Sequence, residues 1–273
     1  MNSLTILLSA LLLYSTTSTT DSHTPTSYYS DVASSIREGQ TKTLKKLLSN
    51  LPIGESLPNL LETEFCFTLT PLCYAAKTNP STIATLLELG ADPNTAHKET
   101  MTTPLMFASR SGEVEAAEIL LSAVRSSGGD VDTVDSLGST ALSIVSLTCN
   151  YKVAEILLNA GADPSKKDNA GNNALHVAAW YCDSAAGVLV DGRFKTDGGA
   201  TFARTLLRYM DAEKVDDLSG TGRSALMLSA MKGGDGFYNV LVEEGKADEN
   251  KKSPKDEKTA KELLSERKSK KDL

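Results

Sequence analysis

The sequence has few aromatic side chains, only three histidines and no apolar run as long as a membrane span. Aromatic residues make up 5% of the 273 residues, and Ala and Leu supply most of the 40% that are hydrophobic. This mixture favours helices packed closely on helices over a β-sandwich. The net charge of −7 argues against nucleic acid as a main partner, because phosphate contacts need a basic surface. We therefore expect a helical protein that does not bind nucleic acid.

The longest apolar run, Leu4–Tyr14, lies near the N-terminus and has eleven residues, whereas a membrane-spanning helix needs about 20. Small polar residues follow it, which is typical of a secretory signal with cleavage between Ser15 and Thr20, although no Lys or Arg precedes the run. The alternative is a frayed N-terminal helix. We expect residues 1–20 to form a signal peptide or hydrophobic N-terminal segment, residues 21–29 to form a linker, and no membrane contact beyond that segment.

The usual motifs of catalysis and metal binding are absent. Gly220–Ser224 is rich in glycine, but no Lys-Ser/Thr pair follows it to hold a phosphate and Mg²⁺. Asp130–Asp135 begins like a calcium-binding loop, but Val134 occupies a position that needs an oxygen ligand. The sequence contains neither a Gly-x-Ser-x-Gly elbow nor a His-Glu-x-x-His motif. We therefore expect no catalytic residues, no cofactor and no metal site.

One short pattern recurs at a period of about 33 residues. Thr-Pro-Leu, or a variant of it, opens five units, which start at Thr70, Thr103, Thr140, Asn173 and Ser224. A Leu-Leu or Leu-Val pair follows 16 or 17 residues after four of these starts, and Gly-Ala-Asp-Pro closes two units, at Gly90–Pro93 and Gly161–Pro164. Landmarks that share one period predict repeated units, each too small to bury its own apolar face, that stack into a continuous core.

The residue types indicate helices within each unit. Thr70 can cap a helix, and Pro71 suits the first helical position, where its missing amide costs no hydrogen bond. Paired alanines such as Ala75-Ala76 allow neighbouring helices to approach to about 8–10 Å. Gly90 and Gly161 can end a second helix by adopting a left-handed conformation.

These landmarks resemble the ankyrin repeat, whose units open with Thr-Pro-Leu-His and close with Gly-Ala-Asp-Pro. The resemblance covers residues 30–250. It implies an all-α solenoid of about six stacked helix-turn-helix repeats with β-hairpin turns between them. His176 occupies the histidine position of the opening motif, where a hydrogen bond to the backbone is expected.

The departures from the repeat fall at one insertion and at the C-terminus. The fifth unit carries about 16 extra residues, near 183–199, which we expect to form a surface loop, since such insertions cost little stability. Residues 251–273 contain nine basic and five acidic side chains and form a basic tail. Within it, Pro254–Lys268 is predicted to form a helix that caps the last repeat.

The resemblance also implies that a partner binds at the hairpin tips and at the exposed side of each first helix. Counting four and seven residues from the repeat starts predicts the contact residues Trp180, Tyr74, Phe107, Arg110, Leu147 and Met231, and Tyr181 is expected to face the groove beside Trp180. The N-terminal half of this groove is then basic, and its C-terminal half is apolar and aromatic. Two alternatives stay open: the residues at the fourth position can pack between repeats, and the insertion can fold over Trp180.

We therefore expect a monomeric, non-catalytic scaffold or adaptor that binds a partner protein. The alternative is a secreted or ER-lumenal structural protein that contacts membrane or matrix through its insertion and basic tail. The protein would enter the secretory pathway if residues 1–20 are a signal peptide, and would otherwise be cytoplasmic.

The four cysteines bear on the same question. Cys149 and Cys182 hold equivalent positions one repeat apart, and a helix spacing near 10 Å exceeds the Cα separation of about 7 Å that a disulfide tolerates. We therefore expect free, buried thiols, which suit a reducing compartment. Pairing between Cys66 and Cys73 stays open.

Overall fold

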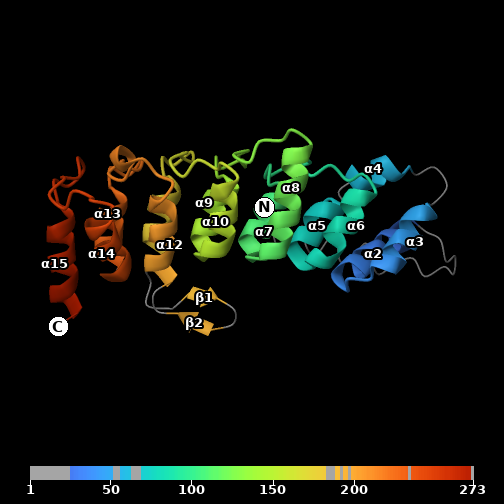
Figure 1. Cartoon of the computed structure of the whole chain (residues 1–273), viewed down its shortest axis with the longest axis horizontal. Helices are drawn as coiled ribbons and strands as arrows, with labels where there is room; N and C mark the ends of the chain where they lie inside the picture. Colours follow the sequence, from blue (N-terminus) through green and yellow to red (C-terminus); the bar gives the residue numbers. More distant parts are fainter. Residues whose placement is uncertain are drawn as a thin grey trace, which may run out of the picture.

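The computed structural model describes residues 25–51, 56–62, 69–182, 188–190, 193–195, 198–232 and 235–271. In this part of the chain the α-helices come in six pairs that stack side by side, with the short α4 between the first and second pairs and α15 after the last pair (Figure 1). The elements are α2 Pro25–Arg37, α3 Thr41–Ser49, α4 Leu57–Glu62, α5 Pro71–Thr78, η1 Pro80–Thr82, α6 Ile83–Glu88, α7 Pro104–Ser111, α8 Val114–Ser126, α9 Ala141–Thr148, α10 Tyr151–Asn159, α11 Ala174–Tyr181, β1 Val188–Val190, β2 Arg193–Lys195, α12 Gly198–Leu207, η2 Ala212–Lys214, α13 Ala225–Lys232, α14 Asp235–Glu243 and α15 Ala260–Lys271. The predicted all-α solenoid of stacked repeats is confirmed.

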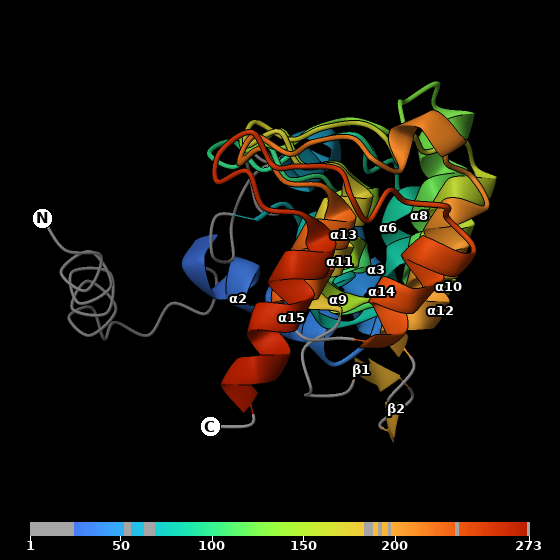
Figure 2. The same ribbon diagram turned by 90° about the vertical axis from the view of Figure 1, so that its left-hand side faces the viewer.

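The helices form two layers, which are seen end-on in Figure 2. The first helices of successive repeats contact one another in the order α5, α7, α9, α11 and α13, and we call them the inner layer. The second helices α6, α8, α10, α12 and α14 contact one another in the same way and form the outer layer. Figure 2 shows the turns between repeats gathered at one end of the helices, where they project beyond the inner layer.

Each inner helix begins with a side chain that caps it. The Thr70 hydroxyl accepts a hydrogen bond from the Cys73 amide (3.3 Å), and the Thr103 hydroxyl accepts one from the Met106 amide (3.3 Å). Asn173 performs the same role for α11 through its Oδ1 (3.0 Å). Each cap satisfies an amide that the helix itself leaves unpaired and stabilises the helix by about 1 kcal/mol.

The turns between repeats are closed hairpins that also bond to one another. The Asp168 amide donates to the Asn172 carbonyl (2.9 Å) within one turn, and the Gly220 amide of the next turn donates to the Ala170 carbonyl (3.1 Å). A Cβ on Gly220 would lie 2.2 Å from the Ala170 oxygen, so only glycine allows this approach. Gly220–Ser224 is thus part of an inter-repeat turn.

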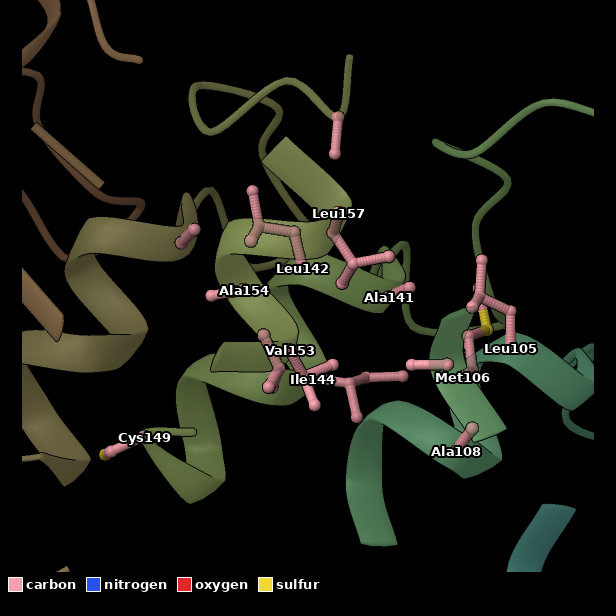
Figure 3. Close-up of a cluster of buried hydrophobic side chains, with 14 of the residues drawn as sticks. Leu105, Met106, Ala108, Ala141, Leu142, Ile144, Cys149, Val153, Ala154 and Leu157 are labelled. Atoms are coloured by element: carbon pink, nitrogen blue, oxygen red, sulfur yellow. The ribbon is translucent and has the colours of Figure 1, made fainter. Parts of the chain in front are cut away.

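A single apolar core runs through the stack. Figure 3 shows how Leu105 and Met106 of α7 lie beside Ala141 and Ile144 of α9, with side chains of α10 completing the cluster. The buried alanines let the helices approach, while each fully buried Leu or Ile contributes about 1.5–3 kcal/mol through removal from water. The core is therefore continuous from repeat to repeat.

The two departures from the repeat take distinct forms. Within the insertion, β1 and β2 pair antiparallel, with Leu189 opposite Phe194. The helix α12 starts at Gly198, so the last two residues of the 183–199 segment are helical. At the C-terminus, α15 packs on α13 with Ala260 and Leu263 buried, and thereby extends the inner layer.

The segment 1–20 lies outside the described residues. The first described helix, α2, begins at Pro25, within the 21–29 segment that was expected to be a linker. None of the helices in the described part of the chain combines the length and apolar character that a membrane span requires.

Candidate functional site

The residues predicted from the seventh repeat position lie on the helices of the inner layer, and none of them is fully buried. Leu147 of α9 is 39% exposed and Tyr181 of α11 is 52% exposed, which is high for large apolar side chains. Trp180 and Met231 are half-buried. The Lys232 ammonium lies 4.0 Å from the centroid of the Trp180 ring, a cation–π contact that holds the indole in place.

One hollow lies against α11 and α13 and has a volume of about 280 Å³. Trp180, Tyr181 and Leu228 supply its apolar part, while Thr221 and Arg223 of the overhanging turn supply its polar part. The Arg223 guanidinium pairs with the Asp256 carboxylate at 2.7 Å. This Arg223 pairing holds the pKa of Asp256 below its usual range. The hollow is thus an aromatic surface with a fixed polar edge.

A second, more polar hollow of about 450 Å³ lies against α5 and α7. Lys77 and Arg110 line it from the helices, Phe107 forms part of its apolar wall, and Thr100 and Thr102 line it from the turn. The predicted division into a basic N-terminal half and an aromatic C-terminal half therefore corresponds to two separate hollows on the inner layer.

Residues at the fourth repeat position differ from one another in exposure. Tyr74 is only 4% exposed and belongs to the core, so it offers no surface to a partner. Ile144 and Leu228, at the same repeat position, are also buried, at 2% and 7% exposure. Phe107 and Val177 are half-buried and line the two hollows. The alternative of packing between repeats thus describes Tyr74, Ile144 and Leu228, whereas Phe107 and Val177 stay partly exposed.

The expectation of free thiols at Cys149 and Cys182 is wrong, because the two form a disulfide with a Cα–Cα distance of 5.5 Å. The helix spacing near 10 Å separates the helix axes, but Cα atoms stand about 2.3 Å off the axis. Two Cα atoms that face each other are therefore only about 5.4 Å apart, within disulfide range. Cys73 is buried, and Cys66 lies outside the described residues.

The repeats themselves match known family models. The model described as "Ankyrin repeats (3 copies)" matches residues 32–127, and the model "Ankyrin repeat" matches residues 137–169. The chain is an ankyrin repeat protein.

Proteins similar to this ankyrin chain include regulators from two animals. NF-kappa-B inhibitor alpha of Sus scrofa is 29% identical over 144 residues, which cover 51% of this chain and 41% of that protein. The ARF GTPase-activating protein Git of Drosophila melanogaster is 35% identical over 85 residues, which cover 31% of this chain and 11% of that protein. The chain therefore spans less than half the length of these relatives.

A solved structure has the same fold. The crystal structure of the ankyrin repeat domain of Bcl-3, a unique member of the IkappaB protein family, matches with a TM-score of 0.67 and 20% sequence identity. The match covers 90% of this chain and 98% of the Bcl-3 chain. At this identity the likeness concerns the fold alone.

His176 has the structural role expected of the ankyrin histidine. Its Nε2 lies 2.9 Å from the Asp217 carbonyl oxygen, and its Nδ1 lies 3.3 Å from the Asn173 amide. Burial lowers the pKa of His176 to about 4, so the ring is neutral at physiological pH. In the described part of the chain, no group of three His, Cys, Asp or Glu side chains has an arrangement that could hold a metal ion.

Charge is divided between the two layers in a way that the repeat pattern did not predict. The five inner helices contain three basic side chains, Lys77, Arg110 and Lys232, and no Asp or Glu. The five outer helices contain six acidic and three basic side chains. An acidic ankyrin protein thus has a basic inner layer, a signal that becomes visible only when charges are counted helix by helix.

Proposed function

We propose that this ankyrin chain is a non-catalytic scaffold that binds a partner protein along the inner layer and its turns. The observation that carries the proposal is the row formed by the exposed Leu147 and Tyr181 and the half-buried Trp180 on successive inner helices. Exposed aromatic side chains that lie in a hollow are the usual anchors of protein interfaces. The printed names of both relatives describe proteins that act on other proteins, which supports a regulatory scaffold.

The chemistry of Trp180 suits an anchor. Its contact with Lys232 already restricts the indole, so binding a partner costs less side-chain entropy than ordering a mobile side chain would. A partner that covers the ring removes it from water and gains the contact area of the largest side chain. Trp180 is therefore expected to dominate the affinity.

The test is affinity capture with the full chain and its Trp180→Ala variant. We expect Trp180→Ala to weaken binding of the captured partner by about 2 kcal/mol or more, and to leave the thermal midpoint of unfolding within a few degrees. Tyr209→Ala is the control, since Tyr209 is an aromatic residue, 40% exposed, that follows the outer helix α12 and so lies away from the inner layer. A large loss of stability in Trp180→Ala with unchanged binding would place the indole in the core and refute the proposal.

A specific observation supports the second candidate, a secreted or ER-lumenal protein that contacts membrane or matrix through its insertion and basic tail. The Cys149–Cys182 disulfide suits an oxidising compartment, because cytosolic thiols are kept reduced. We propose that the ankyrin scaffold works there, in keeping with the signal-like residues 1–20. Mass spectrometry of the mature protein should find the bridged peptide and an N-terminus near residues 15–20; an intact Met1 with reduced thiols would contradict this.

A further inference from the structure

The hollow at α5 and α7 presents two cations without an acidic partner. Lys77 and Arg110 are both exposed, and within the described residues no carboxylate lies at ion-pair distance from either. The hydroxyl groups nearby are already engaged: Thr100 bonds to Thr102 (2.8 Å), and Ser111 donates to the Ala108 carbonyl (3.0 Å). The two cations are therefore the groups that remain to receive a ligand, and a cation pair suits an anionic one.

The wider charge pattern favours an anionic segment along the whole inner layer. Lys232 adds a third cation beside Trp180, and the five inner helices from α5 to α13 carry no carboxylate. The two carboxylates of α15, which packs on α13, are already engaged, one by Thr259 and one by Lys258. Two acidic side chains of the turns, Asp135 and Asp168, each accept two backbone amides of their own turn through Oδ1. Because screening limits charge effects to about 8 Å at physiological salt, these local cations outweigh the distant acidic outer layer.

The distance between the two hollows determines how many residues separate the acidic side chain and the apolar side chain of such a segment. Arg110 lies on α7 and Trp180 on α11, two repeats apart, with Leu147 on α9 between them. Successive helices are separated by about 8–10 Å, so the two hollows lie about 20 Å apart. An extended chain covers about 3.3–3.6 Å per residue, so about six residues bridge them.

We infer that the partner presents an extended acidic segment, in which a carboxylate side chain binds between Lys77 and Arg110. An aromatic or branched apolar side chain about six residues away then contacts Trp180 and Tyr181, and the backbone between them passes over Leu147. This inference rests on the proposed function and specifies the chemistry of the partner.

The test uses synthetic peptides and the full chain, with binding followed by fluorescence anisotropy. Each peptide holds a Glu pair and one Trp in a Gly-Ser background, at shorter, equal and longer separations than about six residues, in both orders. We expect the tightest binding at the predicted separation in one of the two orders. Peptides with Lys in place of Glu should bind at least about tenfold more weakly.

Variants of the chain test whether Arg110 supplies the positive charge that binds the Glu peptide. Arg110→Gln should weaken binding of the Glu peptide about tenfold and reduce its dependence on salt, whereas Arg125→Gln, a matched change on the outer helix α8, should leave both unchanged. Equal binding of Glu and Lys peptides, or no effect of Arg110→Gln, would overturn the inference. So would binding of a phosphoserine peptide but not of the Glu peptide, since this assigns the hollow to phosphate.

The two proposals can fail separately. If Trp180→Ala loses the captured partner while Glu peptides fail to bind, the scaffold function stands and the acidic segment is refuted. If Trp180→Ala still captures the partner, the inner layer is not the interface and the proposed function fails first.

Discussion

Replacing Cys149 and Cys182 together by Ala removes a covalent link between the ends of α9 and α11. The two residues are 33 positions apart, and the loss of loop-closure entropy in the unfolded chain for a loop of that size corresponds to about 3.7 kcal/mol at 25 °C. We therefore expect the free energy of unfolding to fall by about 3–4 kcal/mol. Both side chains are buried and small, so the alanines themselves add little to this loss.

The assay is urea unfolding of the wild type and the double variant, each with and without a thiol reductant. The reductant should lower the midpoint of the wild type to that of the variant and leave the variant unchanged. Equal midpoints of oxidised and reduced wild type would refute the reasoning, and so would two reactive thiols at these positions in the protein purified without reductant.

A single substitution at Cys149 separates the effect of losing the disulfide from the effect of backbone strain at this residue. Cys149 ends α9 in a left-handed conformation (φ 57°), and Gly112 ends α7 in the same conformation (φ 76°). This conformation costs a non-glycine residue about 1 kcal/mol. Cys149→Gly loses the disulfide but also this strain, so it should be more stable than Cys182→Ala by about 1 kcal/mol. A reversed order would contradict the strain assigned to the left-handed conformation of Cys149.

Two further predictions concern His176 and a pair of glycines. Because burial lowers the pKa of His176 to about 4, the unfolded state binds a proton more readily than the folded state between pH about 6.5 and 4. Stability should fall by up to about 3 kcal/mol as the pH drops through this window; unfolding curves of His176→Gln should lack this component, and an unchanged pH slope would contradict it. Gly220→Ala should destabilise the protein by about 2 kcal/mol, since its Cβ would meet the Ala170 oxygen at 2.2 Å. Gly236→Ala, in α14 with its nearest contact at 3.6 Å, should instead stabilise by about 0.5 kcal/mol; thermal unfolding distinguishes the pair.

The fold was predictable because the sequence of each repeat contains the signals that mark where its helices begin. Thr103 caps and Pro104 starts an inner helix, and the same signals return about one period later with the same structural result. Local hydrogen bonding determines these features, so no knowledge of distant contacts is needed. The helix α15 was predictable for a similar reason, since Ala260 and Leu263 are apolar residues within a charged segment.

Features that depend on neighbouring repeats were harder to predict. Tyr74, Ile144 and Leu228 hold the same repeat position as Phe107, yet these three are buried while Phe107 stays partly exposed. The Cys149–Cys182 disulfide depends on which side of each helix faces the other. The distance between the two helix axes does not tell whether the cysteines lie on the facing sides. The contact of Lys232 with Trp180 joins two helices whose residues are 52 positions apart, too remote for any local pattern.

The disulfide and the candidate interface occupy the same part of the molecule, and this bears on how the scaffold would recognise a partner. Cys149 follows Leu147 by two residues, and Cys182 follows Trp180 by two. The link therefore joins the ends of the two inner helices that carry the central apolar contacts, and it limits how far these can move apart. A fixed separation between anchors lowers the ordering cost of binding and selects partners whose own anchors match it. Each repeat of the solenoid contacts only its neighbours, so distant repeats cannot fix the distance between the ends of α9 and α11. A disulfide between these two helices fixes that distance directly.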